Sequence, residues 1–158
     1  VGRAPGGRHA PGGAAPGVEE MNVLIMGSGR LGARIATLLD TAGHNVTVLD
    51  INPGSFRRLP EGFRGSRAIG NGMDGPALER AGIQNMDAFM AVTQGDNRNY
   101  FASMMAREIY HVPRVLCRIY DPVREQIFRE LGLETFSPTS IGAKIMVEML
   151  LGGEQGER

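Results

Sequence analysis

Residues 21–32 read MNVLIMGSGRLG, and this stretch decides the fold. An apolar run ends at Met26 and leads directly into glycines at positions 27, 29 and 32. Such a run followed by Gly-x-Gly-x-x-Gly predicts a buried strand, a tight turn and a helix. The first glycine allows the turn, the second lets a pyrophosphate approach the backbone, and the third lets the helix pack closely on the sheet.

A carboxylate in the right place strengthens this interpretation. Asp50 ends the second apolar run, NVTVLD, 18 residues after Gly32. An acid at this distance is placed to bind the two hydroxyls of a ribose, while the diphosphate lies on free N–H groups at the positive end of the helix. A carboxylate repels a 2′-phosphate, so NAD or adenosine phosphates are favoured over NADP. The alternative is that the glycines only make a tight turn and Asp50 only caps the next segment.

The rest of the chain alternates β-rich runs with helical patterns. The expected strands are 22–27, 45–50, 66–70, 87–93, 114–120 and 133–136, and the expected helices are 31–42, 74–83, 96–110, 121–132 and 137–153. We expect Asp74, Asp96 and Asp121 to cap three of these helices. This alternation predicts an α/β doubly wound, Rossmann-like parallel sheet of six strands in the order 3-2-1-4-5-6, with a C-terminal crossover helix.

Ligands of such sheets bind beyond the carboxyl ends of the strands, which brings further side chains into the prediction. Asn71 follows the third strand and is placed to contact an adenine edge. Thr93 and Gln94 follow the fourth strand, where a diphosphate and a second ribose pass. Arg118 either places a cation near phosphates or pairs with Asp121 or a nearby carboxylate. Arg57 and Arg58, which follow Asp50 in the sequence, either bind a phosphate or form a solvated helix face.

Composition limits the remaining function classes. The chain has 158 residues with 17 basic and 17 acidic side chains, so no nucleic-acid footprint is predicted. The longest apolar runs are too short to span a bilayer, and the single cysteine suits a reducing compartment. We expect residues 1–20, rich in Gly, Pro and Ala, to be a disordered leader or a mis-called start before Met21, and residues 152–158 to be a flexible tail.

Several blocks resemble one known family. These are MNVLIMGSGRLG, VTVLD, DAFMAVTQGDNRN and RVLCRIYDPVREQIFRELGLETFSPT. They are similar to the RCK or KTN nucleotide-binding domain, found in the cytosolic regulatory subunits of bacterial Trk and Ktr potassium-uptake systems and in the gating rings of some potassium channels. The resemblance covers residues 21–151. The family usually has Gly-Asp after the third strand, where this chain has Gly70-Asn71.

The resemblance implies a function and a set of contacts. It implies a regulatory subunit that senses NAD/NADH or ATP/ADP, binds a potassium-transporting membrane subunit, and lies at the inner face of the membrane without inserting into it. It assigns the nucleotide to Gly27, Ser28, Gly29, Arg30, Leu31, Gly32, Asp50, Asn71, Thr93, Gln94 and Arg118. It implies that Asn99 is structural. Many members continue into a second ligand-binding domain, so this chain is expected to be a single-domain regulator or to receive that domain from another chain.

The final helical segment suggests self-association. Ile141, Ile145 and Met149 share one face, and further apolar residues lie on other faces. Since this helix crosses to a partner subunit in the resembled family, a homodimer or larger ring is expected; the alternative is docking on its own sheet.

Two other functions compete with the regulator. A nicotinamide-dependent oxidoreductase needs a substrate pocket and a positioned acid or base, and no sequence motif supplies one. His44 and His111 are expected at the amino edge of the sheet, away from the ligand. The sequence therefore predicts no catalytic residue and no metal site. The other alternative is an orphan nucleotide sensor that serves another transporter or a cytosolic partner.

Overall fold

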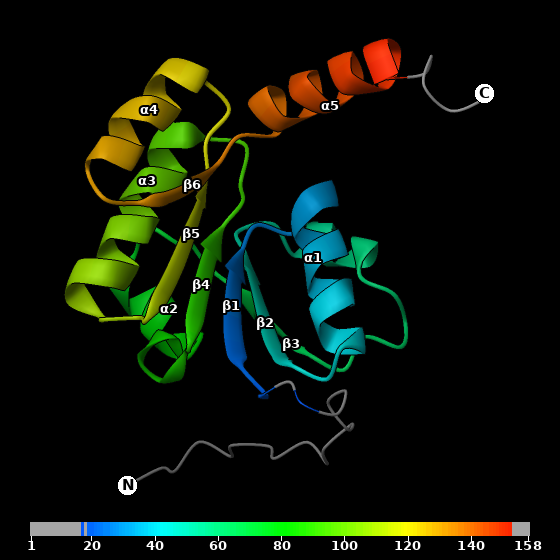
Figure 1. Cartoon of the computed structure of the whole chain (residues 1–158). Helices are drawn as coiled ribbons and strands as arrows, with labels where there is room; N and C mark the ends of the chain where they lie inside the picture. Colours follow the sequence, from blue (N-terminus) through cyan, green and yellow to red (C-terminus); the bar gives the residue numbers. More distant parts are fainter. Residues whose placement is uncertain (1–16, 18, 153–158) are drawn as a thin grey trace, which may run out of the picture.

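The computed structural model describes residue 17 and residues 19–152. It contains one six-stranded parallel sheet in the order β3-β2-β1-β4-β5-β6, which confirms the predicted topology (Figure 1). The strands are β1 Asn22–Met26, β2 Asn45–Asp50, β3 Ser66–Ile69, β4 Ala88–Ala91, β5 Arg114–Arg118 and β6 Glu134–Phe136. Because the order reverses between β1 and β4, the carboxyl ends of these strands open into a crevice.

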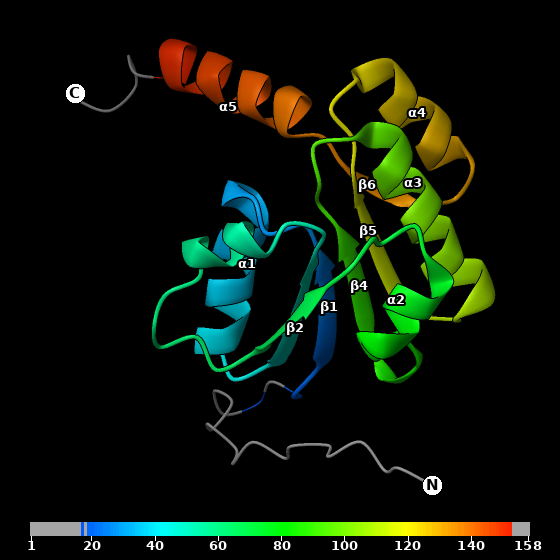
Figure 2. The same ribbon diagram turned by 180° about the vertical axis from the view of Figure 1, so that it is seen from behind.

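Helices cover both faces of the sheet. They are α1 Arg30–Thr41, α2 Gly75–Arg80, α3 Asp96–Met104, α4 Pro122–Glu130 and α5 Pro138–Gly152, with short turns η1 Pro53–Arg58, η2 Ile83–Asn85 and η3 Met105–Ile109. Figures 1 and 2 show α1 and η1 on one face and α2, α3 and α4 on the other. The expected helix 96–110 is therefore two pieces, because its last turn widens into a π-helix.

Strand β1 contributes to both cores. Val23 and Ile25 pack with α1 on one face, whereas Leu24 and Met26 pack with the helices on the opposite face. Successive side chains of a strand point to opposite faces, so a continuous apolar run is required where helices cover both. All four side chains are at most 3% exposed.

The predicted capping chemistry is correct at two helices and wrong at the third. The carboxylate of Asp74 accepts a hydrogen bond from Ala77 N (3.3 Å), and that of Asp121 accepts one from Val123 N (2.9 Å). Asp96 does not cap its own helix, because Gly95 is the N-cap of α3. The buried carboxylate of Asp96 instead accepts hydrogen bonds from Tyr120 N and Asp121 N in the loop before α4.

Helix α5 does not dock on its own sheet. None of its fifteen residues is buried, and Figure 1 shows it extending away from the sheet and the other helices. Its base is held by Ser140, whose hydroxyl hydrogen-bonds to Glu125 of α4 (3.4 Å). The apolar side chains of α5 therefore need a cover from outside the described part of the chain.

The chain termini fall largely outside this description. The predicted leader 1–20 is described only at residues 17, 19 and 20, and the predicted tail 152–158 only at residue 152. Within residues 19–152, no helix has the length and apolar character that crossing a membrane requires.

Candidate functional site

A cleft of about 870 Å³ opens at the carboxyl edge of the sheet, in the size range of small-molecule sites. It lies over the ends of β1, β2, β4 and β5. Nine predicted site residues line it: Gly27, Gly29, Arg30, Leu31, Asp50, Asn71, Thr93, Gln94 and Arg118. The other two, Ser28 and Gly32, lie behind the lining and are buried.

The three glycines of the β1–α1 turn differ in why they occur there. Gly27 has φ +113°, a backbone conformation that residues with a side chain rarely adopt. A Cβ on Gly32 would lie 1.8 Å from the carbonyl oxygen of Gly27, so only glycine lets α1 approach the turn. A Cβ on Gly29 would meet nothing within 4 Å. Packing therefore requires Gly27 and Gly32, whereas Gly29 leaves open space in the cleft wall.

The amino end of α1 faces this open space. Among the residues that the structure describes, no side chain caps α1, so its first N–H groups are not occupied by a capping residue. The Ser28 amide is already used, because it donates to the Asp50 carboxylate (2.7 Å), and the Ser28 hydroxyl hydrogen-bonds to the carbonyl of Ser55 (3.2 Å). An anion would therefore meet the amides that follow Ser28, at the positive end of the helix dipole.

Asp50 has two structural bonds and still lines the cleft. Its Oδ2 accepts from Ser28 N, and its Oδ1 accepts from Asn52 N (2.8 Å). The capping role considered as an alternative is thus present. Since a carboxylate has about four acceptor positions, it can also receive two ribose hydroxyls without losing these bonds.

Arginines make the cleft strongly cationic. Arg30, Arg58, Arg98 and Arg118 line it, and Asp50 is the carboxylate among its described lining residues. Within residues 19–152, none of these four arginines takes part in an ion pair. The alternative pairing of Arg118 with Asp121 is therefore wrong, since Asp121 pairs with Arg124 (3.8 Å). Four arginines against one carboxylate favour a ligand with several negative charges.

Two of these arginines lie outside the predicted set of site residues: Arg98 was not predicted, and Arg58 had two possible roles. Of the two roles left open for Arg57 and Arg58, the cleft position holds for Arg58, which η1 turns toward the cleft, whereas Arg57 is not a lining residue. Arg98 lies in the first turn of α3, two residues after Asp96. The signal for Arg98 was its place in the first turn of the helix that follows β4, where helix amino ends face the crevice, whereas Arg58 ends η1 and had no comparable signal.

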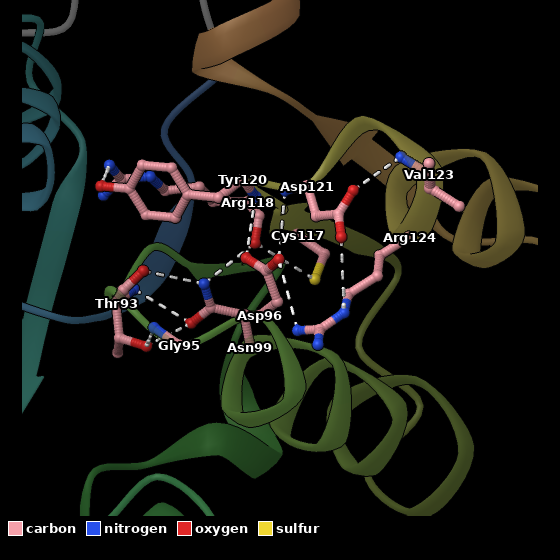
Figure 3. Close-up of polar contacts among 10 residues, drawn as sticks. All are labelled: Thr93, Gly95, Asp96, Asn99, Cys117, Arg118, Tyr120, Asp121, Val123 and Arg124. Carbon is pink, nitrogen blue, oxygen red and sulfur yellow. Dashed lines mark hydrogen bonds and ion pairs between the residues drawn. The ribbon is translucent and has the colours of Figure 1, made fainter.

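Asn99 joins the two strand ends that form the far side of the cleft (Figure 3). Its side chain is fully buried. The Oδ1 atom accepts from Thr93 N (3.0 Å) and the Thr93 hydroxyl, and Nδ2 donates to the carbonyls of Thr93 and Arg118 (both 2.9 Å). The predicted structural role of Asn99 is confirmed.

The other predicted contact residues, Asn71, Thr93 and Gln94, also line the cleft. Two of them already use a side-chain oxygen in hydrogen bonds within the protein. The side-chain oxygen of Asn71 accepts from Met73 N (3.0 Å), and that of Thr93 accepts from Gly95 N (3.3 Å). Gln94 is exposed at the boundary with a second hollow of about 760 Å³. This second hollow shares Met73, Gln94, Arg98 and Tyr120 with the main cleft.

The histidines and the cysteine that the structure describes are not among the lining residues of the cleft. The Nδ1 atom of His44 accepts from Met21 N (3.1 Å) at the amino edge of the sheet, and His111 lies in the loop before β5. Burial raises the pKa of the Cys117 thiol to about 11, so the thiolate is scarce at neutral pH. The described residues contain no group of three His, Cys, Asp or Glu side chains placed to hold a metal ion.

The comparison with known proteins decides the family. A profile for the TrkA-N domain matches residues 23–138. This chain belongs to the TrkA-N domain family. The Trk system potassium uptake protein TrkA of Streptomyces coelicolor is 44% identical over 131 residues, which cover 83% of this chain and 59% of that protein. The chain therefore spans somewhat over half the length of this curated relative.

Solved structures share the fold of this TrkA-N domain. The GsuK channel bound to NAD has a TM-score of 0.74 at 24% identity, covering 90% of this chain and 25% of that chain. The Kef CTD of Shewanella denitrificans in AMP-bound form has a TM-score of 0.71 at 17% identity, covering 86% of this chain and 83% of that chain. At these identities the likeness establishes the fold alone.

Proposed function

We propose that this TrkA-N domain is the nucleotide-sensing part of a regulatory protein for a Trk-type potassium uptake system. Its ligand is an adenine nucleotide, either NAD/NADH or ATP/ADP. The cleft carries this proposal: within residues 19–152, a helix amino end without a side-chain cap and four arginines without an ion-pair partner surround one carboxylate suited to ribose. The NAD-bound and AMP-bound relatives of the same fold support an adenine nucleotide, and the TrkA relative supports the transport system.

The same cleft supports sensing rather than turnover. The described histidines lie away from it, and the cysteine near it is held as a thiol. Binding without chemistry can still regulate, because a ligand shifts a conformational equilibrium when its affinities for the two states differ. The pairs NAD and NADH, or ATP and ADP, share the adenosine half and differ at the far end. We infer that this far end carries the signal.

The regulatory protein acts on the cytoplasmic side of the membrane and assembles as a homodimer or larger ring. The uncovered apolar surface of α5 supports self-association. Contact with the membrane is made through the potassium-transporting subunit, not by insertion of this domain. No catalytic or metal-dependent step is part of the proposal.

Calorimetric titration with NAD, NADH, ATP and ADP tests the binding step. Replacing Asp50 by alanine should weaken the best ligand at least tenfold, a cost of about 1.5 kcal/mol or more, because a charge-assisted ribose contact is lost. Asp87→Ala is the matched control: Asp87 also accepts a backbone hydrogen bond, from Asn22 N (2.7 Å), but at the amino edge of the sheet. Equal affinity in the Asp50 and Asp87 variants would refute the ribose contact.

A further inference from the structure

Arg118 has an unusual partner for a cleft arginine. Its Cζ lies 4.1 Å from the centroid of the Tyr120 ring, and its Nη2 donates to the Tyr120 hydroxyl (Figure 3). Its Nη1 donates to the carbonyl of Val92 (3.3 Å). Among the residues that the structure describes, its buried Nε has no hydrogen-bond partner. The guanidinium is thus held by neutral groups, and its charge is not neutralised.

The sheet order places Arg118 beyond the diphosphate. Asp50 ends β2, the glycine turn follows β1, and Arg118 ends β5, with β4 lying between β1 and β5. Because neighbouring strands are about 4.8 Å apart, Arg118 lies roughly 10 Å along the edge from the glycine turn. A nucleotide with its ribose on Asp50 and two phosphates at the turn therefore brings its next group toward Arg118.

We propose that Tyr120 is a specificity-determining residue of the nucleotide cleft. The Tyr120 side chain keeps Arg118 in contact with itself, and Arg118 leaves it only when the ligand carries an anionic group beyond the diphosphate. A third phosphate forms a charge-assisted bond with arginine, which is stronger than a cation–π contact at a partly exposed site. The neutral or cationic end of a dinucleotide does not compete in this way. This inference rests on the proposed nucleotide site and favours nucleoside triphosphates as its ligand class.

The surrounding contacts allow the Tyr120 side chain to move while its backbone stays fixed. Asp96 is 7% exposed and accepts from Tyr120 N (2.7 Å) and Asp121 N (3.2 Å). Arg124 lies 3.7 Å from Asp96 and 3.8 Å from Asp121, which caps α4. The Tyr120 ring, in contrast, is exposed and lines both the main cleft and the neighbouring hollow. Releasing Arg118 therefore needs a side-chain rotation only.

Removing the ring should make Arg118 more available to the ligand. In calorimetric titrations of the full chain, Tyr120→Ala should bind ATP about three- to tenfold more tightly than the wild type, and AMP within about twofold of it. Tyr120→Phe keeps the ring over the guanidinium and should show a smaller gain. Val123→Ala, an exposed position on α4, is the control and should change neither affinity.

A double-mutant cycle shows whether the effect passes through Arg118. Arg118→Gln should weaken ATP more than AMP, and adding Tyr120→Ala to it should then have no further effect on ATP. Weaker ATP binding by Tyr120→Ala, or equal changes for AMP and ATP, would overturn the role of Tyr120 while leaving the nucleotide site intact. A wild-type chain that binds no adenine nucleotide would overturn the proposed function together with this inference.

Discussion

Strand β1 and helix α5 consist of similar residues but have opposite environments. Val23, Leu24, Ile25 and Met26 in β1 are at most 3% exposed, whereas Leu150 in α5 is 78% exposed. Both segments read as strongly apolar in the sequence. For β1 the chain supplies covering helices on both faces, while no element among the described residues buries α5. Apolar content thus predicts that a segment must be covered, but the topology decides whether the same chain covers it.

The largest effect is expected inside β1. Leu24→Ala should lower the free energy of unfolding by about 2–5 kcal/mol, because it removes a fully buried side chain and leaves a cavity between the sheet and the helices that cover this face. Urea denaturation followed by circular dichroism measures this loss. The matched control is Leu38→Ala on α1, where the side chain is 54% exposed and the loss should stay below about 0.5 kcal/mol. Similar losses at both positions would break the comparison.

In the β1–α1 turn, close packing involves backbone atoms as well as side chains. Gly32→Ala should cost about 1–3 kcal/mol of stability, because its Cβ would collide with the carbonyl oxygen of Gly27, a backbone atom that cannot rotate away. The same urea experiment measures it.

Gly29→Ala is the control, because its Cβ meets open space and its stability cost should stay below about 1 kcal/mol. It should weaken nucleotide binding instead, since the new methyl group lies where the ligand approaches. Two glycines that lost equal stability would contradict their separate roles.

The sequence predicts the body of this domain well because its signals are local. Alternating runs and turn residues gave the strand order, and the spacing of Gly32 and Asp50 placed the turn and the acid correctly. Asp96 was misassigned because a first-turn aspartate can accept hydrogen bonds from its own helix or from a neighbouring loop, and sequence spacing does not distinguish these. The sequence left two roles open for Arg58, because η1, which turns it toward the cleft, has no clear periodicity.

The partner of Arg118 was also beyond sequence reasoning. Both Asp121 and Tyr120 are close in sequence, and charge alone favoured the carboxylate. In the structure Asp121 is committed to capping α4 and to Arg124, so the aromatic ring takes the guanidinium instead. Competition among neighbours for one partner is a property of the packed state.

Substitutions in α5 should have the smallest effect on the free energy of unfolding, and they should change the oligomeric state instead. We predict that the wild type is a dimer by light scattering at micromolar concentration and that Ile145→Ser with Met149→Ser makes it a monomer. These residues lie four apart on one face and are 49% and 72% exposed. In dilute samples where both proteins are monomeric, their free energies of unfolding should agree within about 0.5 kcal/mol.

Lys144→Ser with Glu148→Ser is the matched control, because it makes two changes at the same spacing on a polar strip of the same helix. This variant should remain a dimer. If it dissociated as well, the apolar face of α5 would not be the contact. A monomeric wild type would mean that a different molecule covers α5, and the contrast with β1 would then concern a partner protein rather than a second copy of this chain.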